Sequence, residues 1–363
     1  MSNLRMMFPG GNTCKGFFSF YDYIVRPDAK RVFVLKGGPG VGKSSLMKNL
    51  GYEFLDMGYN VEFHWCSSDN ASLDAMVLAD YQVALIDGTA PHIVDPRSPG
   101  AVDEIINLGE YWNQSRLEEH RLEIINYNLS VARLFRLAYL RLAEAKAIYT
   151  TWEEFNQPPV SPAIRRDIVK SIKEQILASC DPLAREPWQR HLFAAAITPE
   201  GIINYSKTLI DDDYRLIIIK GAPGSGVQKI VGSMVFWIQE EEIPAEIYHN
   251  PFNPDLVDII KIPNSKIALV DGTGIVARYD CLNDDNLKRE VFELEVDVSE
   301  KVTVDFSNRF SHALAGAVDY INQAKQCHDQ METIYIPAMH FDRVELKKAE
   351  IKERIIEVIK KSS

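Results

Sequence analysis

The chain has 363 residues, of which 46% are apolar and 25% are charged, a balance typical of folded globular proteins. This composition excludes disordered, collagen-like and disulfide-scaffold classes, and the length is sufficient for two domains. The net charge is −11, from 40 basic and 51 acidic residues, so nucleic acid is not an expected partner. A small phosphate compound remains a candidate ligand, because a few backbone amides and one lysine can form its pocket.

The five cysteines lie far apart and never form a Cys-x-x-Cys pair, which is typical of a reduced chain without a zinc site. The sequence starts without an apolar segment of signal-peptide length and has no apolar run of about 18 residues. We therefore predict a cytoplasmic protein that has no membrane partner.

Alternating strands and helices are predicted from the first apolar run onward. Val32–Leu35 predicts a strand buried on both faces, and Ser44–Met57 predicts a helix. Asn60–Trp65 and Gln82–Ile86 predict further strands. This alternation predicts an α/β fold in which a mostly parallel sheet is flanked by helices.

A glycine-rich segment lies between the first predicted strand and the first predicted helix. Gly37–Ser44, here named the first glycine-rich loop, fits the P-loop pattern G-x-x-x-x-G-K-[ST]. A random chain of this length would contain only about 0.01 such matches. Glycines let the backbone curl so that successive amides face a polyphosphate, and the following helix adds its positive dipole end.

The motif predicts a role for the residues that end this loop. Lys43 is expected to reach the β- and γ-phosphates of ATP, and the Ser44 hydroxyl to bind Mg²⁺. A merely tight turn would require neither side chain. The residues expected to contact the nucleotide are Gly37, Gly38, Pro39, Gly40, Val41, Gly42, Lys43, Ser44 and Ser45.

Asp87 follows the predicted strand 82–86 and lies about 45 residues after the loop. P-loop proteins place an acidic residue near the magnesium at this position, so we interpret Asp87 as a metal-side carboxylate that is needed for catalysis. The alternative interpretation is a turn or cap residue. Asp69, in the polar loop after the strand 60–65, is a candidate contact for substrate or a metal-bound water, and turn formation explains it equally well.

The loop after Asp87 supplies two more candidates. His92 or Asp95 could orient a phosphate acceptor or a water beside the γ-phosphate. The alternative is a proline-rich turn that leads into a helix, with Ser98 as its N-cap and Pro99 as its first residue, followed by the amphipathic stretch Val102–Trp112. Residues 113–149 contain neither proline nor glycine and predict one or two further helices.

The chain repeats itself at an offset of 184 residues. Residues 31–89 share 13 identities in 59 ungapped positions with residues 215–273, against about 3 to 4 expected from average composition. The pattern Ile-Lys-Glu-x-Ile also occurs twice, beginning at Ile172 and at Ile351. We therefore predict a duplication with two α/β domains, residues 1–183 and 184–363.

With these motifs, the chain resembles the P-loop nucleoside triphosphatases over the core of both halves. More closely, it resembles a group of bacterial ATP-binding proteins with two P-loop domains in tandem. The resemblance implies ATP and Mg²⁺ as ligands and carries over Lys43, Ser44 and Asp87 by motif position. It carries over no substrate.

The second copy departs from the motif. In Gly221–Gln228, the second glycine-rich loop, Val227 and Gln228 stand where the first loop has lysine and serine. Lys229 comes two residues late, and about 200° of rotation around a helix directs it elsewhere. We therefore predict that the second half binds Mg-ATP weakly or not at all. It would serve as a regulatory or structural half, and the two halves could pack as an intramolecular pseudo-dimer.

The leading functional hypothesis is an ATP-binding protein whose N-terminal half performs slow hydrolysis or phosphotransfer. Asp87 is followed by Gly88, whereas motor and transporter ATPases usually carry a water-activating glutamate there. One alternative is a small-molecule or nucleotide kinase. The other is a non-catalytic binding protein that nucleotide controls, with an unknown small-molecule or protein partner.

Overall fold

The computed structural model of the chain forms two compact units. It describes residues 3–89, 93–179, 188–277, 279, 282, 288–296 and 300–362. Unit 1 comprises Met1–Pro9, Ser19–Leu137 and Asp319–Ser363, and unit 2 comprises Gly10–Phe18 and Ala138–Val318. The predicted boundary between residues 183 and 184 lies outside the described residues. Each unit takes residues from both halves of the sequence, so the units differ from the ranges 1–183 and 184–363.

Unit 1 is built on a sheet of six described strands. Their order is β1 (Leu4–Met7), β5 (Val61–Trp65), β6 (Leu73–Leu78), β7 (Val83–Asp87), β4 (Arg31–Lys36) and β8 (Asp103–Asn107). β6 is antiparallel to both of its neighbours, and the other pairs are parallel. The connections 66–72 and 79–82 on either side of β6 are too short for a parallel crossover, which needs about a dozen residues. The sheet is therefore mostly parallel, with one antiparallel strand that the sequence pattern did not predict.

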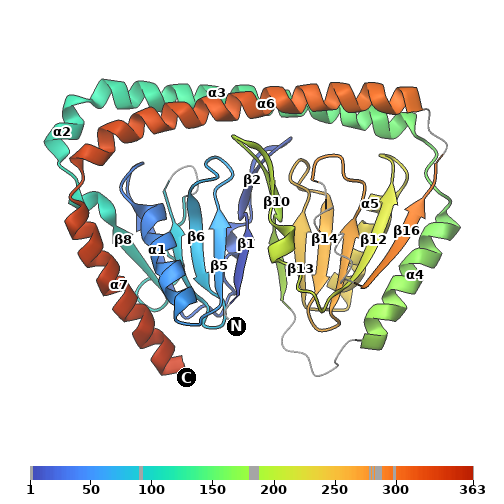
Figure 1. Cartoon of the computed structure of the whole chain (residues 1–363), viewed down its shortest axis with the longest axis horizontal. Helices are drawn as coiled ribbons and strands as arrows, with labels where there is room; N and C mark the ends of the chain where they lie inside the picture. Colours follow the sequence, from blue (N-terminus) through green and yellow to red (C-terminus); the bar gives the residue numbers. More distant parts are fainter. Residues whose placement is uncertain are drawn as a thin grey trace. The chain divides into compact units, whose positions relative to one another are not determined.

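Two helices cover one face of this sheet, α1 (Lys43–Asp56) and α7 (Phe341–Ser362) (Figure 1). Both are amphipathic, with buried apolar residues three or four positions apart. Leu50 and Phe54 of α1 meet Ile351 and Ile355 of α7 in one core with the strands. The opposite face of the sheet packs on apolar residues near the short helix η1 (Tyr21–Tyr23).

The alternative interpretation of a helix that begins at Pro99 and continues along Val102–Trp112 was wrong. Asp103–Asn107 forms the edge strand β8, which pairs in parallel with β4, and only Leu108–Tyr111 coils into the short helix η2. Backbone pairing with a buried strand thus overrides the amphipathic pattern of this short segment. Glu104 of β8 accepts a hydrogen bond from Nη1 of Arg354 at 2.6 Å, which lowers the pKa of its carboxyl group.

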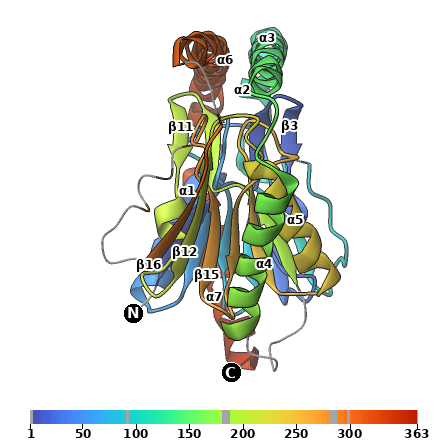
Figure 2. The ribbon, with the colours of Figure 1, turned by 90° about the vertical axis from the view of Figure 1, so that its right-hand side faces the viewer.

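Unit 2 contains a second sheet with the corresponding strand order. Across it lie β9 (Gln189–Leu192), β13 (Ala245–His249), β14 (Val257–Ile262), β15 (Ile267–Asp271), β12 (Arg215–Gly221) and β16 (Lys288–Leu294). β14 is antiparallel to its neighbours, as β6 is in unit 1, and the other pairs are parallel. The helices α4 (Pro162–Ser179) and α5 (Val227–Glu240) pack on one face of this sheet (Figure 2).

Short elements complete the two units. Two small sheets are formed by β2 (Gly10–Thr13) with β3 (Gly16–Ser19) and by β10 (Ala195–Thr198) with β11 (Gly201–Asn204). The remaining short helices within the described ranges are α2 (Gln114–Glu119), η3 (Ser206–Thr208) and η5 (Ile336–Ala338). Among the described helices, none has the apolar length that a bilayer crossing requires.

Each sheet is covered by a helix from the other half of the sequence. Ile172 and Ile176 of α4, which precede residue 183, are fully buried in the core of the second sheet. The equivalent pair of the sequence repeat, Ile351 and Ile355 of α7, is fully buried in the core of the first sheet. Neither half of the sequence therefore supplies the complete core of its own sheet.

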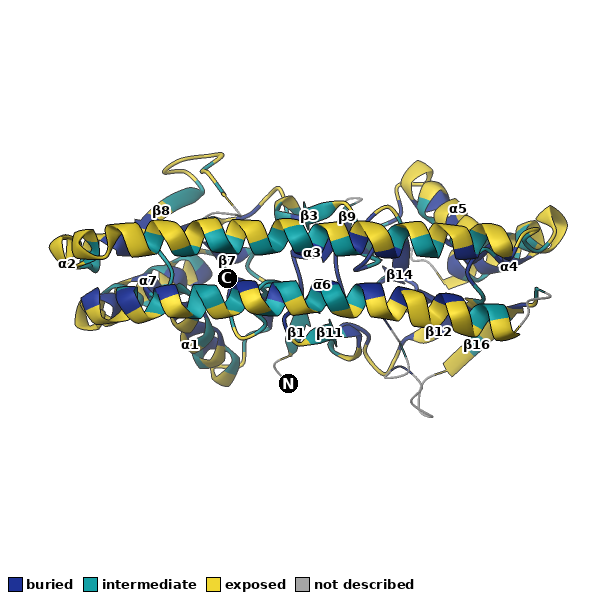
Figure 3. Cartoon of the chain, turned by 90° about the horizontal axis from the view of Figure 1, so that it is seen from above, coloured by how far each residue is buried: buried dark blue, intermediate teal, exposed yellow. Residues whose placement is uncertain are grey.

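The exchange is made by two long helices, α3 (Arg121–Phe155) and α6 (Glu300–Tyr335). The chain passes from unit 1 to unit 2 within α3 and returns to unit 1 within α6. In unit 2 the two helices contact each other, and Trp152 stacks on Phe306 with ring centroids 6.0 Å apart. Buried and exposed residues alternate along both helices (Figure 3). The predicted helical stretch 113–149 therefore consists of α2 and most of α3.

Candidate functional site

The first glycine-rich loop connects β4 to α1, between a buried strand and a helix as predicted. Gly40 and Gly42 have φ angles of 66° and 92°, in the left-handed region that favours glycine. Gly42 caps α1, so Lys43 is the first residue of this helix of 14 residues. The first amides of a helix lack intrahelical acceptors and carry a partial positive charge. The segment therefore has the backbone of an anion-binding loop.

The Lys43 side chain folds back over this loop. Its Nζ donates hydrogen bonds to the carbonyl oxygens of Gly37 and Gly38, at 3.0 and 2.8 Å. The same Nζ lies 3.6 Å from Oδ2 of Asp87. Lys43 and Asp87, which the sequence predicted to act together, thus lie side by side at the loop.

Asp87 is the last residue of β7, next to β4 in the sheet. Its Oδ1 accepts a hydrogen bond from the Thr89 amide at 2.9 Å, and the Thr89 hydroxyl donates to the Gly37 carbonyl at 3.0 Å. Asp87 therefore shapes the turn after β7, as the turn interpretation predicted, and it also faces Lys43. Its role at a metal ion stays a prediction.

The other predicted loop residues lie in different environments. Oγ of Ser44 accepts a hydrogen bond from the Leu73 amide at 3.0 Å, which ties the start of α1 to β6. Val41 is buried in the core of unit 1, so only its backbone can contact a ligand. Pro39 is half-buried and Ser45 is exposed.

Asp74 was not among the residues predicted from the sequence. It lies in β6, and the antiparallel register that pairs Ala75 with Ile86 places Asp74 opposite Asp87. Asp74 is only 4% exposed, and burial raises its pKa to about 7, with the Asp87 carboxylate as a further cause. Like charges on facing strand positions repel each other, so a proton or a cation stabilises such a pair. The signal for it was present, because Asp258 repeats Asp74 at the offset of 184 residues.

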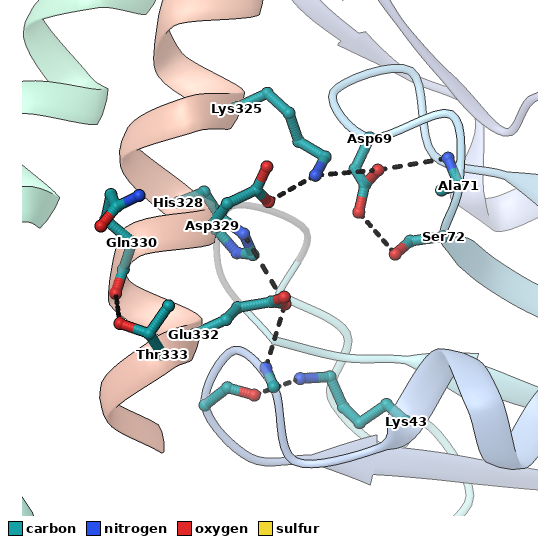
Figure 4. A network of polar contacts seen from close by, with 12 residues as sticks. Lys43, Asp69, Ala71, Ser72, Lys325, His328, Asp329, Gln330, Glu332 and Thr333 are labelled. Carbon is teal, nitrogen blue, oxygen red and sulfur yellow. Dashed lines mark hydrogen bonds and ion pairs between the residues drawn. The ribbon is translucent and has the colours of Figure 1, made fainter. Parts of the chain in front are cut away.

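The C-terminal end of α6 brings a second set of charged residues to the first glycine-rich loop (Figure 4). Oε1 of Glu332 accepts a hydrogen bond from the Gly40 amide at 3.2 Å. Nδ1 of His328 lies 3.8 Å from the same carboxylate oxygen. His328, Asp329 and Glu332 offer potential metal-ligand atoms within 4.8 Å of one another. Asp329 is ion-paired with Lys325, however, and Glu332 accepts a hydrogen bond from the loop. Two of the three potential metal ligands therefore already have protein partners.

Asp69 lies near this group. Its Oδ1 accepts a hydrogen bond from the Ala71 amide at 3.2 Å, and its Oδ2 accepts one from the Ser72 hydroxyl at 2.6 Å. These two hydrogen bonds form a turn, which was the alternative role predicted for Asp69. Asp69 also lies 3.6 Å from Nζ of Lys325, a contact with α6 that the sequence did not predict (Figure 4).

The loop after Asp87 is only partly described. His92 lies outside the described residues. The Asp95 side chain is 80% exposed, and its Oδ1 lies 3.5 Å from Nζ of Lys36. That ammonium group also donates hydrogen bonds to the carbonyls of Gly88 and Val94, both at 2.8 Å. Asp95 therefore contacts Lys36 rather than Lys43.

The second glycine-rich loop lies between β12 and α5 in unit 2. Val227 is buried, and Gln228 turns its side-chain amide toward the sheet. Nε2 of Gln228 donates hydrogen bonds to the Val257 carbonyl at 3.0 Å and to Asp271, the counterpart of Asp87. An amide donor thus replaces the serine hydroxyl, and the acidic residue at this loop is already hydrogen-bonded.

A buried carboxylate pair also lies in unit 2, where Asp258 faces Asp271 across β14 and β15. Asp258 accepts hydrogen bonds from Nδ2 of Asn250 at 2.9 Å and from the Tyr279 hydroxyl at 2.6 Å. Burial and the neighbouring Asp271 raise its pKa to about 7. Both aspartates line a cavity of about 20 Å³, room for about one water.

The geometry of unit 1 therefore combines a glycine-rich loop at a helix N-terminus, a lysine above it and two facing aspartates. Comparison of the chain with protein-family models, with curated proteins and with solved structures finds no match.

Proposed function

We propose that the chain is a P-loop nucleoside triphosphatase formed by duplication, with its working site in unit 1. The observation that carries the proposal is the first glycine-rich loop, whose lysine lies within 3.6 Å of the aspartate that ends the neighbouring strand. The duplication is supported by the corresponding strand orders of the two sheets and by the 184-residue repeat. A cytoplasmic location, suggested by the free thiols of Cys14, Cys66 and Cys327 among the described residues, is part of the same proposal.

The proposed ligand of the loop is ATP with Mg²⁺. Backbone amides of Gly37–Lys43 would bind the phosphates, and Lys43 would neutralise part of their charge. Ser44 and Asp87 would hold Mg²⁺, and the facing Asp74 makes this corner of the site favourable for a cation. The ion would supply charge stabilisation for the transferred phosphoryl group.

The proposed reaction is slow hydrolysis or phosphotransfer. Gly88 follows Asp87, so no carboxylate is present at the position next to it for activating a water. Unit 2 would be regulatory or structural, because Val227 offers no charge to a phosphate and Gln228 is hydrogen-bonded to Asp271. The proposed reaction would then involve one further molecule, a phosphate acceptor or a protein partner.

Labelled ATP tests this proposal. The full chain, with Mg²⁺ and γ-labelled ATP, should release label slowly or transfer it to a component of a metabolite pool. Asp87→Asn should lower the rate by at least about tenfold, because it removes a carboxylate from the Mg²⁺ site. Asp80→Asn, an exposed carboxylate of the same unit, serves as the matched control and should leave the rate unchanged. A rate that Asp87→Asn does not alter would contradict the assignment.

A further inference from the structure

The end of α6 places a carboxylate on the proposed phosphate-binding loop. Oε1 of Glu332 accepts the Gly40 amide hydrogen bond at 3.2 Å, between residues 292 positions apart in the sequence (Figure 4). The Glu332 side chain is about one-third exposed, so it is neither a free surface group nor a core residue. A carboxylate on a loop amide next to a helix N-terminus is the interaction that a phosphate oxygen would make there.

Apolar packing holds this contact in place. A Cβ atom added at Gly38 would come within 2.7 Å of the Tyr335 ring, so the ring lies directly against the loop backbone. A Cβ added at Gly40 would lie 3.0 Å from Ile336, which belongs to η5 just after α6. The absence of side chains at these two glycines therefore lets the α6 terminus approach the loop as closely as it does.

The same amide cannot donate its hydrogen bond fully to both a carboxylate and a phosphate. The Glu332 carboxylate and a phosphate bound at the same amide would also repel each other, and the repulsion is strong where solvent is partly excluded. We propose that Glu332 is a built-in competitor for the polyphosphate position, and that nucleotide binding to the first glycine-rich loop displaces it. This inference rests on the proposed function and adds a regulatory residue to that site.

The displaced residue belongs to a helix that extends far from the loop. α6 is continuous from Glu300 to Tyr335, and its residues 300–318 are part of unit 2. Loss of the Glu332 contact would remove the hydrogen bond between this helix and the Gly40 amide, while the packing of Tyr335 and Ile336 on the loop remains. Glu332 thus gives the second half of the sequence a direct effect on nucleotide affinity at the first loop.

Titration calorimetry of the full chain with Mg-ATP tests the inference. Glu332→Ala should lower the Kd about tenfold, because a hydrogen bond to a charged group stabilises the competing state. Glu332→Gln keeps a hydrogen-bond acceptor without the charge, so its Kd should lie between those of Glu332→Ala and the wild type. Asp329→Asn is the matched control, since this carboxylate on the same helix pairs with Lys325, and its Kd should equal that of the wild type.

Combining these variants with Lys43→Ala separates the two levels of the proposal. If Lys43→Ala weakens binding while both Glu332 variants match or exceed the wild-type Kd, the competitor role is wrong and the proposed function stands. If Lys43→Ala has no effect, the proposed function itself fails. A Glu332→Gln protein that binds normally but turns ATP over more slowly would assign Glu332 to catalysis and overturn its role as a competitor.

Discussion

Replacing Ile355 with alanine should destabilise unit 1 by about 2–5 kcal/mol, the usual cost of truncating a fully buried isoleucine. Ile355 is 0% exposed and belongs to the core that joins α7 to α1 and the first sheet. Leu346→Ala on the same helix is the control, because Leu346 is 72% exposed and its truncation should change stability by less than about 0.5 kcal/mol.

Hydrogen exchange shows where this destabilisation occurs. In Ile355→Ala, the amides of β4 and α1 should lose protection, whereas those of β12 and α5 should keep it. The reciprocal variant Ile176→Ala should reverse the pattern, since Ile176 belongs to the core of the second sheet. Loss of protection in β12 and α5 on changing Ile355 would contradict the exchange of helices between the sequence halves.

The buried Asp258 should make stability fall as the pH rises. Its pKa is raised to about 7 by burial and by Asp271, from an ordinary value of 3.8. Below about pH 4 the folded and unfolded states are both protonated, so this cost is absent. Between about pH 4 and 7 the unfolded chain loses a proton that the folded chain retains, so stability falls across this range.

Asp258→Asn tests this dependence. The variant cannot ionise at this position, so it should be more stable than the wild type at pH 8 and should have a flatter stability curve between pH 4 and 7. A residual slope from Asp74, whose pKa is also raised to about 7, should remain. Asp213→Asn, an exposed carboxylate, is the control for the loss of one charge. Parallel curves for Asp258→Asn and wild type would contradict the prediction.

The local elements of the sheet could be predicted from the sequence. The expected strand at Val32–Leu35 lies within β4, and the expected helix Ser44–Met57 differs from α1 by one residue at each end. Apolar runs and the glycine-rich motif were sufficient to predict these two elements, because burial and backbone conformation along a short segment determine them. β8 was missed because its strand pairing depends on β4, about 70 residues earlier.

The long-range features could not be predicted. The isoleucines at 351 and 355 indicate a buried helix face, but periodicity does not say which sheet that face contacts. Glu332 reaches Gly40 only because α6 returns the chain to unit 1. Asp74 could have been found from the sequence, since it repeats in the second copy. Its position opposite Asp87, however, follows from the antiparallel register of β6 and β7.

The proposed function requires that the first glycine-rich loop binds a nucleoside triphosphate through the ammonium group of Lys43. Calorimetric titration of wild-type protein and Lys43→Ala with Mg-ATP measures this directly. We expect one binding site per chain in the wild type and a Kd raised at least about tenfold in Lys43→Ala, because a charged hydrogen-bond donor to the phosphates is lost. Equal Kd values for the two proteins, or no binding by the wild type at millimolar Mg-ATP, would contradict it.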